Sequence, residues 1–168
     1  RRRLARSVAA ATSGAEAWKL TSTQRAGTAS PKNGCRNTVG VVVIGDEVLS
    51  QKVQDANTPA ILAAMAANGI DVGEVAMLPD VPARIAAVVA DFAARFDFVV
   101  TTGGVGPTHD DCTWASVADA LDEPIELHQE MYERMLQRIS TGVSEQQKRM
   151  AMLPRLGLSP GFNSMASV

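Results

Sequence analysis

Uninterrupted apolar runs alternate along this chain with stretches in which apolar residues recur every three or four positions. VGVVVI (residues 39–44) and DFVVTT (residues 97–102) are nearly continuous runs, whereas IDVGEVAMLPD (residues 70–80) partly alternates. Continuous β-branched runs of this length are typical of strands that are buried on both faces of a parallel sheet. We therefore expect three strands in these segments.

The segments between the strands have the helical period. Residues 54–70 start at a capping candidate, Asn57 or Thr58, continue through Pro59 and an alanine-rich interior, and reach Gly69 just past the expected end. Residues 81–96 repeat apolar positions at helical spacing, and residues 112–121 and 127–140 predict two more helices. We expect these inner-face residues in the first two helices: Ile61, Leu62, Met65, Ala66, Val81, Ile85, Val88, Val89 and Phe92.

The order strand, helix, strand, helix, strand indicates right-handed crossovers in an α/β sheet. A chain of 168 residues with 46% hydrophobic content has the material for one ordinary core. We expect one α/β domain that starts at Val39, preceded by a tail.

The charge divides sharply after Thr38. Residues 1–38 contain eight Lys or Arg and one acid, a net charge of +7, whereas residues 39–168 contain eight bases and seventeen acids, a net charge of −9. The leading segment is rich in Ala, Ser, Thr and Arg and lacks a sustained apolar period, so we interpret residues 1–38 as a disordered basic leader. It resembles a transit peptide, which would direct the chain to a mitochondrion or plastid; without that role the chain would be cytoplasmic.

Other features exclude several classes of protein. The two cysteines, Cys35 and Cys112, have no C-x-x-C partner, which argues against a disulfide framework and a structural zinc site. No apolar run approaches the ~20 residues that span a bilayer. The basic residues are scattered without interleaved aromatic residues, so we expect neither a membrane nor a nucleic acid as partner.

The segment VVTTGGVGPTHDDCTW (residues 99–114) carries the candidate chemistry. Gly103, Gly104 and Gly106 let the backbone approach a ligand between the end of a strand and the start of a helix. This position favours a phosphate or a pyrophosphate, held by the glycines and the amides around Thr108. The spacing matches neither the P-loop nor the dinucleotide fingerprint.

Two readings of the adjacent Asp110 and Asp111 remain open. Carboxylates beside a phosphate repel it unless a divalent cation such as Mg²⁺ lies between them or they transfer protons. Alternatively, one aspartate caps the helix that starts near Thr113, whose hydroxyl either donates to the ligand or caps the helix. Asn57 could also reach the ligand, although we favour a cap there, and His109 is a second-rank acid or metal ligand.

The loop resembles a known family. GGVGPTHDDCT (residues 103–113), GDEVL (45–49), QDANT (54–58) and EQQKRMAMLP (145–154) are similar to the molybdopterin-binding domain shared by MoaB/Mog proteins, the CinA family and the amino-terminal half of FAD synthases. The details resemble the CinA and FAD synthase branch, and the similarity runs from about Val39 to Pro154. It implies a three-layer α/β/α sandwich with a mostly parallel sheet, in a homo-oligomer (dimer or trimer).

The resemblance also implies activities and residues. The CinA-like branch implies metal-dependent hydrolysis of a nucleotide pyrophosphate such as FAD or ADP-ribose. The MoaB/Mog branch implies adenylylation of molybdopterin, and a non-catalytic binding or oligomerisation module is a third reading. The expected catalytic residues are Asp80, Asp110 and Asp111, with the metal on Asp110 and Asp111; the expected phosphate or ligand residues are Asp46, Glu47, Asn57, Gly103, Gly104, Gly106, Thr108 and Thr113.

One departure from the family lies near the carboxyl end. Relatives continue past a P-G-F segment with another strand and a P-G-x-P loop, whereas Gly161 and Phe162 are followed by neither. We therefore expect the C-terminal strand to be missing, which would leave a sheet edge unpaired.

Overall fold

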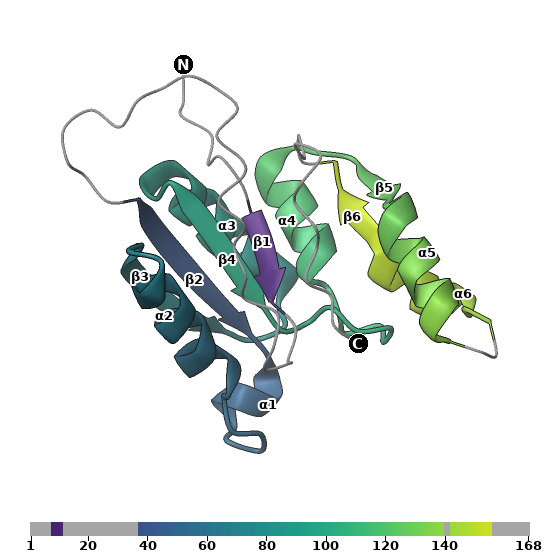
Figure 1. The fold of residues 1–168 in the computed structure, drawn as a ribbon, viewed down its shortest axis with the longest axis horizontal. Helices are drawn as coiled ribbons and strands as arrows, with labels where there is room; N and C mark the ends of the chain where they lie inside the picture. Colours follow the sequence, from purple (N-terminus) through teal and green to yellow (C-terminus); the bar gives the residue numbers. More distant parts are fainter. Residues whose placement is uncertain (1–7, 12–36, 140–141, 156–168) are drawn as a thin grey trace.

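A computed structural model describes residues 8–11, 37–139 and 142–155 of the chain. Its main sheet has four parallel strands in the order β1-β4-β2-β3 (Figure 1). The strands are β1 (Val8–Ala11), β2 (Thr38–Ile44), β3 (Asp71–Leu78) and β4 (Phe98–Thr102). The three strands predicted from the apolar runs are confirmed.

Helices cover both faces of this sheet, which confirms the three-layer α/β/α prediction (Figure 1). One face of β2 packs through Val41 and Val43 against Ile61 and Met65 of α2. The other face packs against α3 and α4. The helices around the sheet are α1 (Asp46–Leu49), α2 (Asn57–Ala67), α3 (Pro82–Arg95) and α4 (Thr113–Leu121).

The helical pattern places most of the predicted inner-face residues correctly. Ile85, Val89 and Phe92 of α3 are buried against the sheet, and a fully buried side chain of this size contributes roughly 1.5–3 kcal/mol. Two expectations are wrong: Ala66 is exposed because α2 turns that face to solvent, and Val81 is exposed because it precedes α3.

The capping prediction for α2 names the wrong residue. The Oδ1 atom of Asp55 accepts hydrogen bonds from the backbone N–H groups of Asn57 at 3.1 Å and Thr58 at 2.9 Å. Asp55 therefore satisfies the first-turn donors that we assigned to a cap at Asn57 or Thr58.

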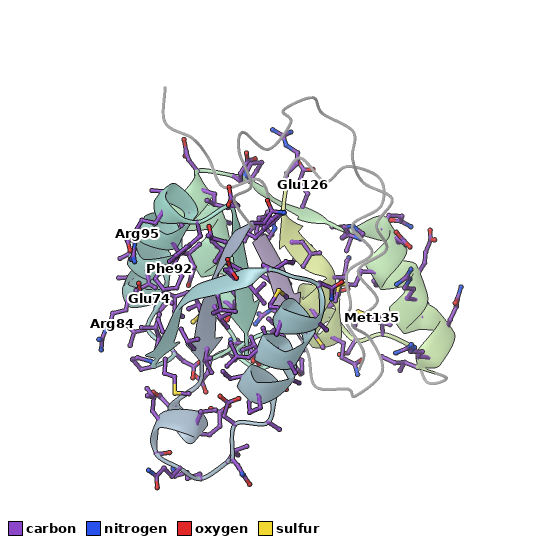
Figure 2. The ribbon with its side chains drawn as sticks, turned by 60° about the vertical axis from the view of Figure 1, so that its left-hand side comes forward. Glu74, Arg84, Phe92, Arg95, Glu126 and Met135 are labelled. Carbon is purple, nitrogen blue, oxygen red and sulfur yellow. The ribbon has the colours of Figure 1, made fainter. Side chains whose placement is uncertain are left out.

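A second, smaller unit follows α4. Two short antiparallel strands, β5 (Ile125–Leu127) and β6 (Met152–Pro154), form their own sheet, which the sequence did not predict. Met131 and Met135 of α5 pack on this unit together with Trp114 of α4. In Figure 2, Met135 lies away from Glu74, Phe92 and Arg95. The remaining elements of the unit are α5 (Gln129–Arg138), α6 (Glu145–Lys148) and the 3₁₀ helix η1 (Arg149–Ala151).

Four residues of the predicted leader belong to the sheet. β1 pairs with β4 from Val8 opposite Val99 to Ala11 opposite Thr102. The expectation of a disordered segment is wrong for these four residues, because their short apolar run adds a strand at the β4 edge. Residues 1–7 and 12–36 lie outside the described residues, so the transit peptide stays a prediction.

Two further expectations concern the carboxyl end and the membrane. The segment in which we expected a missing strand, residues 156–168, lies outside the described part of the chain. Within the described ranges, no helix has the length and apolar content needed to cross a bilayer.

Candidate functional site

The carboxyl ends of β2, β3 and β4 meet at one edge of the sheet. The backbone N–H of Gly45, directly after β2, donates to the carbonyl oxygen of Leu78 at the end of β3 (3.0 Å). Gly103 follows β4 and lies against the end of β2. This edge is where open α/β sheets collect ligands, and it brings Asp46, Asp80 and the glycine loop (residues 103–112) together.

Glycine is required at the first two loop positions. Gly103 has φ +90°, and a Cβ there would lie 1.9 Å from the carbonyl oxygen of Ile44. Gly104 has φ +59°, and its Cβ would lie 2.5 Å from Oγ1 of Thr113 and 3.1 Å from Oδ1 of Asp80. The loop therefore crosses the end of β2 and runs beside the Asp80 carboxylate, which no residue with a side chain permits.

Thr113 holds this loop through two hydrogen bonds. Its backbone N–H donates to the carbonyl of Gly104 at 3.1 Å, and its hydroxyl donates to the carbonyl of Gly103 at 2.8 Å. The residue is fully buried. The cap is therefore wrong, because the N-cap of α4 is Cys112 and the Thr113 hydroxyl bonds within the loop; a ligand contact by Thr113 stays a prediction.

Asp111 also acts inside the loop. Its Oδ2 atom accepts from the backbone N–H of Thr108 at 2.8 Å and from the Thr108 hydroxyl. In this conformation the Thr108 amide is therefore used by Asp111, and its contact with a phosphate stays a prediction. The capping alternative fails, because Cys112 occupies the N-cap of α4 without a side-chain cap. A Cβ at Gly106 would lie 2.8 Å from Asp111 Oδ2, so the third glycine gives this carboxylate its room.

Asp80 is the electrostatically perturbed group of the site. Burial raises the pKa of the Asp80 carboxyl above its ordinary value of 3.8, while a hydrogen bond from the Asp46 N–H to Oδ2 (2.9 Å) lowers it. The negative charges of Glu47, Asp46 and Asp111 raise it further. Four carboxylates therefore lie close enough to one another for their charges to interact.

None of the ion pairs within residues 8–11, 37–139 and 142–155 neutralises these four carboxylates. The same residues contain no group of three His, Cys, Asp or Glu side chains placed to hold a metal. Mg²⁺ is usually bound by one or two carboxylates together with substrate phosphates. Asp80 and Asp111 each have one carboxylate oxygen that accepts no hydrogen bond from the described residues, so they fit a cation that is shared with a phosphate ligand.

Two other residues that we predicted for the site, Asp110 and Asn57, differ in the contacts they make. Asp110, predicted as a catalytic and metal residue, is exposed and makes no hydrogen bond or ion pair with another described residue. Asn57 is not the cap we favoured: its Nδ2 donates to the Thr102 hydroxyl at 2.8 Å and joins the start of α2 to the end of β4. A ligand contact by Asn57 stays a prediction.

Sequence reasoning missed two residues near the loop. Cys112 is half-buried, and burial together with the charges of Asp80 and Asp111 raises the pKa of its thiol. Arg149 of η1 contacts His109 across 40 positions of sequence, with 3.2 Å between Nη1 and Nδ1. No local pattern could have revealed a contact between segments so far apart.

Comparisons with known proteins show which family the chain resembles. Residues 40–163 match a family described as "Probable molybdopterin binding domain". A CinA-like protein of Citrifermentans bemidjiense is 38% identical over 135 residues, which cover 74% of this chain and 33% of that protein. A protein named "Probable FAD synthase" from Caenorhabditis briggsae is 34% identical over 98 residues, covering 58% of this chain and 19% of the relative. The chain thus spans between a fifth and a third of the length of these relatives.

Solved structures share the fold. The CinA protein of Thermoplasma acidophilum, whose function is described as unknown, has a TM-score of 0.64 at 24% identity, with 71% of each chain covered. The molybdopterin biosynthesis enzyme MoaB of Thermus thermophilus has a TM-score of 0.51 at 24% identity and covers 69% of this chain and 70% of that one. Both likenesses concern the fold alone.

Proposed function

The chain belongs to the family of molybdopterin-binding domains, as a domain of the CinA and FAD synthase type, and on that premise we propose that the carboxyl edge of its sheet binds a nucleotide pyrophosphate together with a divalent metal ion and hydrolyses it. The observation that carries the proposal is the meeting of the glycine loop with Asp80, whose carboxylate lies beside Gly104 among three other acids.

The charge of the site supports a cation bound together with the ligand. Phosphate oxygens and four carboxylates repel one another, whereas a divalent cation attracts both. Asp80 and Asp111 are the residues that would hold Mg²⁺ or a similar hard cation. When bound, that ion would neutralise charge on the phosphate oxygens and lower the pKa of a water molecule.

The residues of the chain have distinct roles in this proposal. Gly103 and Gly104 let the loop cross the end of β2 beside Asp80, and Asp111 keeps the loop in shape through Thr108. Asp80 and Asp111 would hold the cation, and the attacking water, whose pKa the cation would lower, would lose its proton to solvent. Water attacks one phosphorus, the bridging P–O bond breaks, and two monophosphates leave the site.

An AMP-release assay tests this function. Purified protein is incubated with ADP-ribose or FAD, with and without Mg²⁺, and AMP is measured by chromatography. We expect metal-dependent AMP release that is lost in Asp80→Asn and kept in Asp91→Asn, an exposed aspartate of α3 that serves as the control. No release under any condition, in a folded protein, overturns hydrolysis and leaves a non-catalytic binding module.

A second candidate is a pterin site of molybdenum cofactor synthesis. The description of the matching family and the MoaB-like fold favour it. Tight binding of a molybdopterin-type ligand, with its adenylate and pyrophosphate formed from ATP and no AMP released from ADP-ribose, would select this adenylyltransferase hypothesis over the first.

Two predictions outside the site belong to the same proposal. We propose that the basic leader directs the chain to an organelle, which imaging of a leader fusion to a fluorescent protein tests. We also propose that the domain assembles as a dimer or trimer, and sedimentation of the purified protein measures its mass in solution.

A further inference from the structure

One contact joins the small β5–β6 unit to the glycine loop. Arg149 in η1 reaches His109 in the loop, with 3.2 Å between Nη1 and Nδ1. Both side chains are exposed, so this pair lies at the surface of the candidate site. It is formed by a part of the chain to which no role has been assigned so far.

The backbone that carries Arg149 is well supported. A capping box formed by Ser144 and Gln147 starts the short α6 helix, which continues directly into η1. Ala151 at the end of η1 is fully buried, and its carbonyl accepts from the His128 N–H at 2.8 Å. The guanidinium is therefore presented to the loop from a fixed base.

The charge around Arg149 differs from that around its neighbours in the small unit. Arg134 pairs with Glu130 at 2.7 Å, and Arg155 pairs with Glu126 at 3.5 Å. Arg149 instead contacts an imidazole ring, and no ion pair joins it to Asp110 among the residues that the structure describes. Among the described residues, no carboxylate forms an ion pair with Arg149.

The chemistry of the pair leaves donors on both partners. A guanidinium has five N–H donors and no acceptor, so the His109 Nδ1 atom must accept this hydrogen bond. The neutral ring then carries its proton on Nε2, which is a donor. Arg149 keeps further N–H groups for a planar, two-point contact with phosphate oxygens.

We propose that Arg149, held beside the loop by His109, binds the second phosphate of the ligand and makes the site select a diphosphate over a monophosphate. This inference rests on the proposed function, because it assigns the first phosphate to the glycine loop. In this arrangement the two phosphates lie between Arg149 on one side and the cation held by Asp80 and Asp111 on the other.

Calorimetric titration with ADP and with AMP, each with MgCl₂, tests this selectivity. The variants are Arg149→Gln, Arg149→Lys and the matched control Arg155→Gln, an arginine of the same unit that pairs with Glu126. We expect Arg149→Gln to weaken ADP binding about tenfold, the effect of losing a charge-assisted contact, with little change for AMP. Arg149→Lys restores part of the loss, and Arg155→Gln leaves both affinities unchanged.

The possible outcomes distinguish failure of this inference from failure of the proposed function. Equal ADP affinity in the wild type and Arg149→Gln, or equal weakening for ADP and AMP, overturns the inference and leaves the proposed function standing. Failure of the folded wild type to bind either nucleotide overturns the proposed function and with it the role of Arg149. Far-ultraviolet circular dichroism of each variant shows whether the fold is retained.

Discussion

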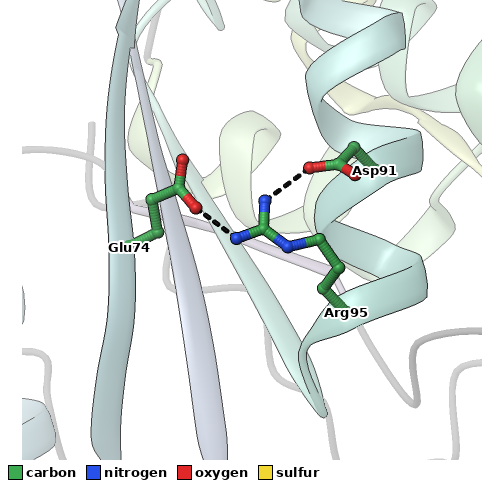
Figure 3. A network of polar contacts seen from close by, with 3 residues as sticks. All are labelled: Glu74, Asp91 and Arg95. Atoms are coloured by element: carbon green, nitrogen blue, oxygen red, sulfur yellow. Dashed lines mark hydrogen bonds and ion pairs between the residues drawn. The ribbon is translucent and has the colours of Figure 1, made fainter.

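The two ends of the main sheet differ in how their acidic side chains are paired. At the amino end, Arg95 pairs with both Glu74 and Asp91, as Figure 3 shows. Near it, Asp97 accepts hydrogen bonds from the backbone N–H and the hydroxyl of Thr38, at 3.0 and 3.1 Å. At the carboxyl end, four carboxylates lie near the glycine loop, and none of them pairs with a cation among the described residues.

This difference indicates that charges at the amino end of the sheet stabilise the fold, whereas those at the carboxyl end are available for binding and chemistry. The guanidinium of Arg95 also lies over the Phe92 and Phe96 rings, at 5.6 and 5.0 Å from their centroids. Both its ion pairs and its ring contacts therefore stabilise this end of the sheet. At the other end, burial works against the ionised form of Asp80. Uncompensated charge in a fold is typical of a site that a ligand completes.

The largest effect is expected where the loop crosses β2. Gly103→Ala places a Cβ against the Ile44 carbonyl in a left-handed backbone, and we expect a loss of roughly 2–6 kcal/mol in the free energy of unfolding. Gly69→Ala is the matched control, because its φ is +67° but its Cβ meets open space; it should cost only about 1–2 kcal/mol. Urea denaturation measures both, and equal losses would show that the close approach is unimportant.

Asp80→Asn should separate function from stability. We expect AMP release to fall more than about 100-fold, because losing a ligand of the cation costs more than the roughly 10–100-fold loss at a residue that only supports a ligand. The raised pKa of Asp80 means that the folded protein binds this proton more tightly than the unfolded chain. The free energy of unfolding of the wild type therefore falls as the pH rises from 3.8 through the raised folded value, and part of that fall should disappear in Asp80→Asn.

Thermal melting of both proteins across this pH range checks the second expectation. Above the raised pKa the variant should melt at the higher temperature, because its neutral amide avoids the buried charge. Identical pH profiles would contradict the account of Asp80.

Thr108→Val should have a smaller effect, limited to the loop. It removes the hydroxyl that donates to Asp111 and keeps the backbone N–H bond. We expect a loss of about 0.5–1.5 kcal/mol in the free energy of unfolding and a weaker affinity for ADP-ribose, because Asp111 is then held by one contact. An affinity that rises instead would show that the Thr108 bond competes with the ligand for Asp111.

The smallest effect is expected at the amino end. Glu74→Gln removes one partner of an exposed arginine, which retains Asp91. We expect a slight fall in melting temperature that high salt reduces, with AMP release unchanged. Loss of activity in this variant would break the contrast between the two ends.

The sequence predicts the main layers because their signals are local. The apolar runs that became β2 and β4 and the helical spacing of Ile85, Val89 and Phe92 each depend on neighbours a few residues away. The β5–β6 sheet was missed because its three-residue strands are too short for a period and pair across 24 intervening residues or more.

The sequence indicates where the glycine loop lies but not which hydrogen bonds form within it. The glycines mark the loop, since positive φ and close approach leave a plain signal in sequence. The partners of Thr113 and Asp111 depend on how the loop folds back, so their hydroxyl and carboxylate roles were assigned to a ligand or a cap instead. The contact between Arg149 and His109 depends on the whole fold.

A calorimetric titration of Mg²⁺-dependent ADP-ribose binding tests the central claim most directly. It compares the wild type with Asp80→Asn at the carboxyl end of the sheet and Asp91→Asn near the amino end. The account predicts that Mg²⁺ strengthens binding in the wild type and in Asp91→Asn but not in Asp80→Asn. Binding that is independent of both Mg²⁺ and Asp80 would contradict it.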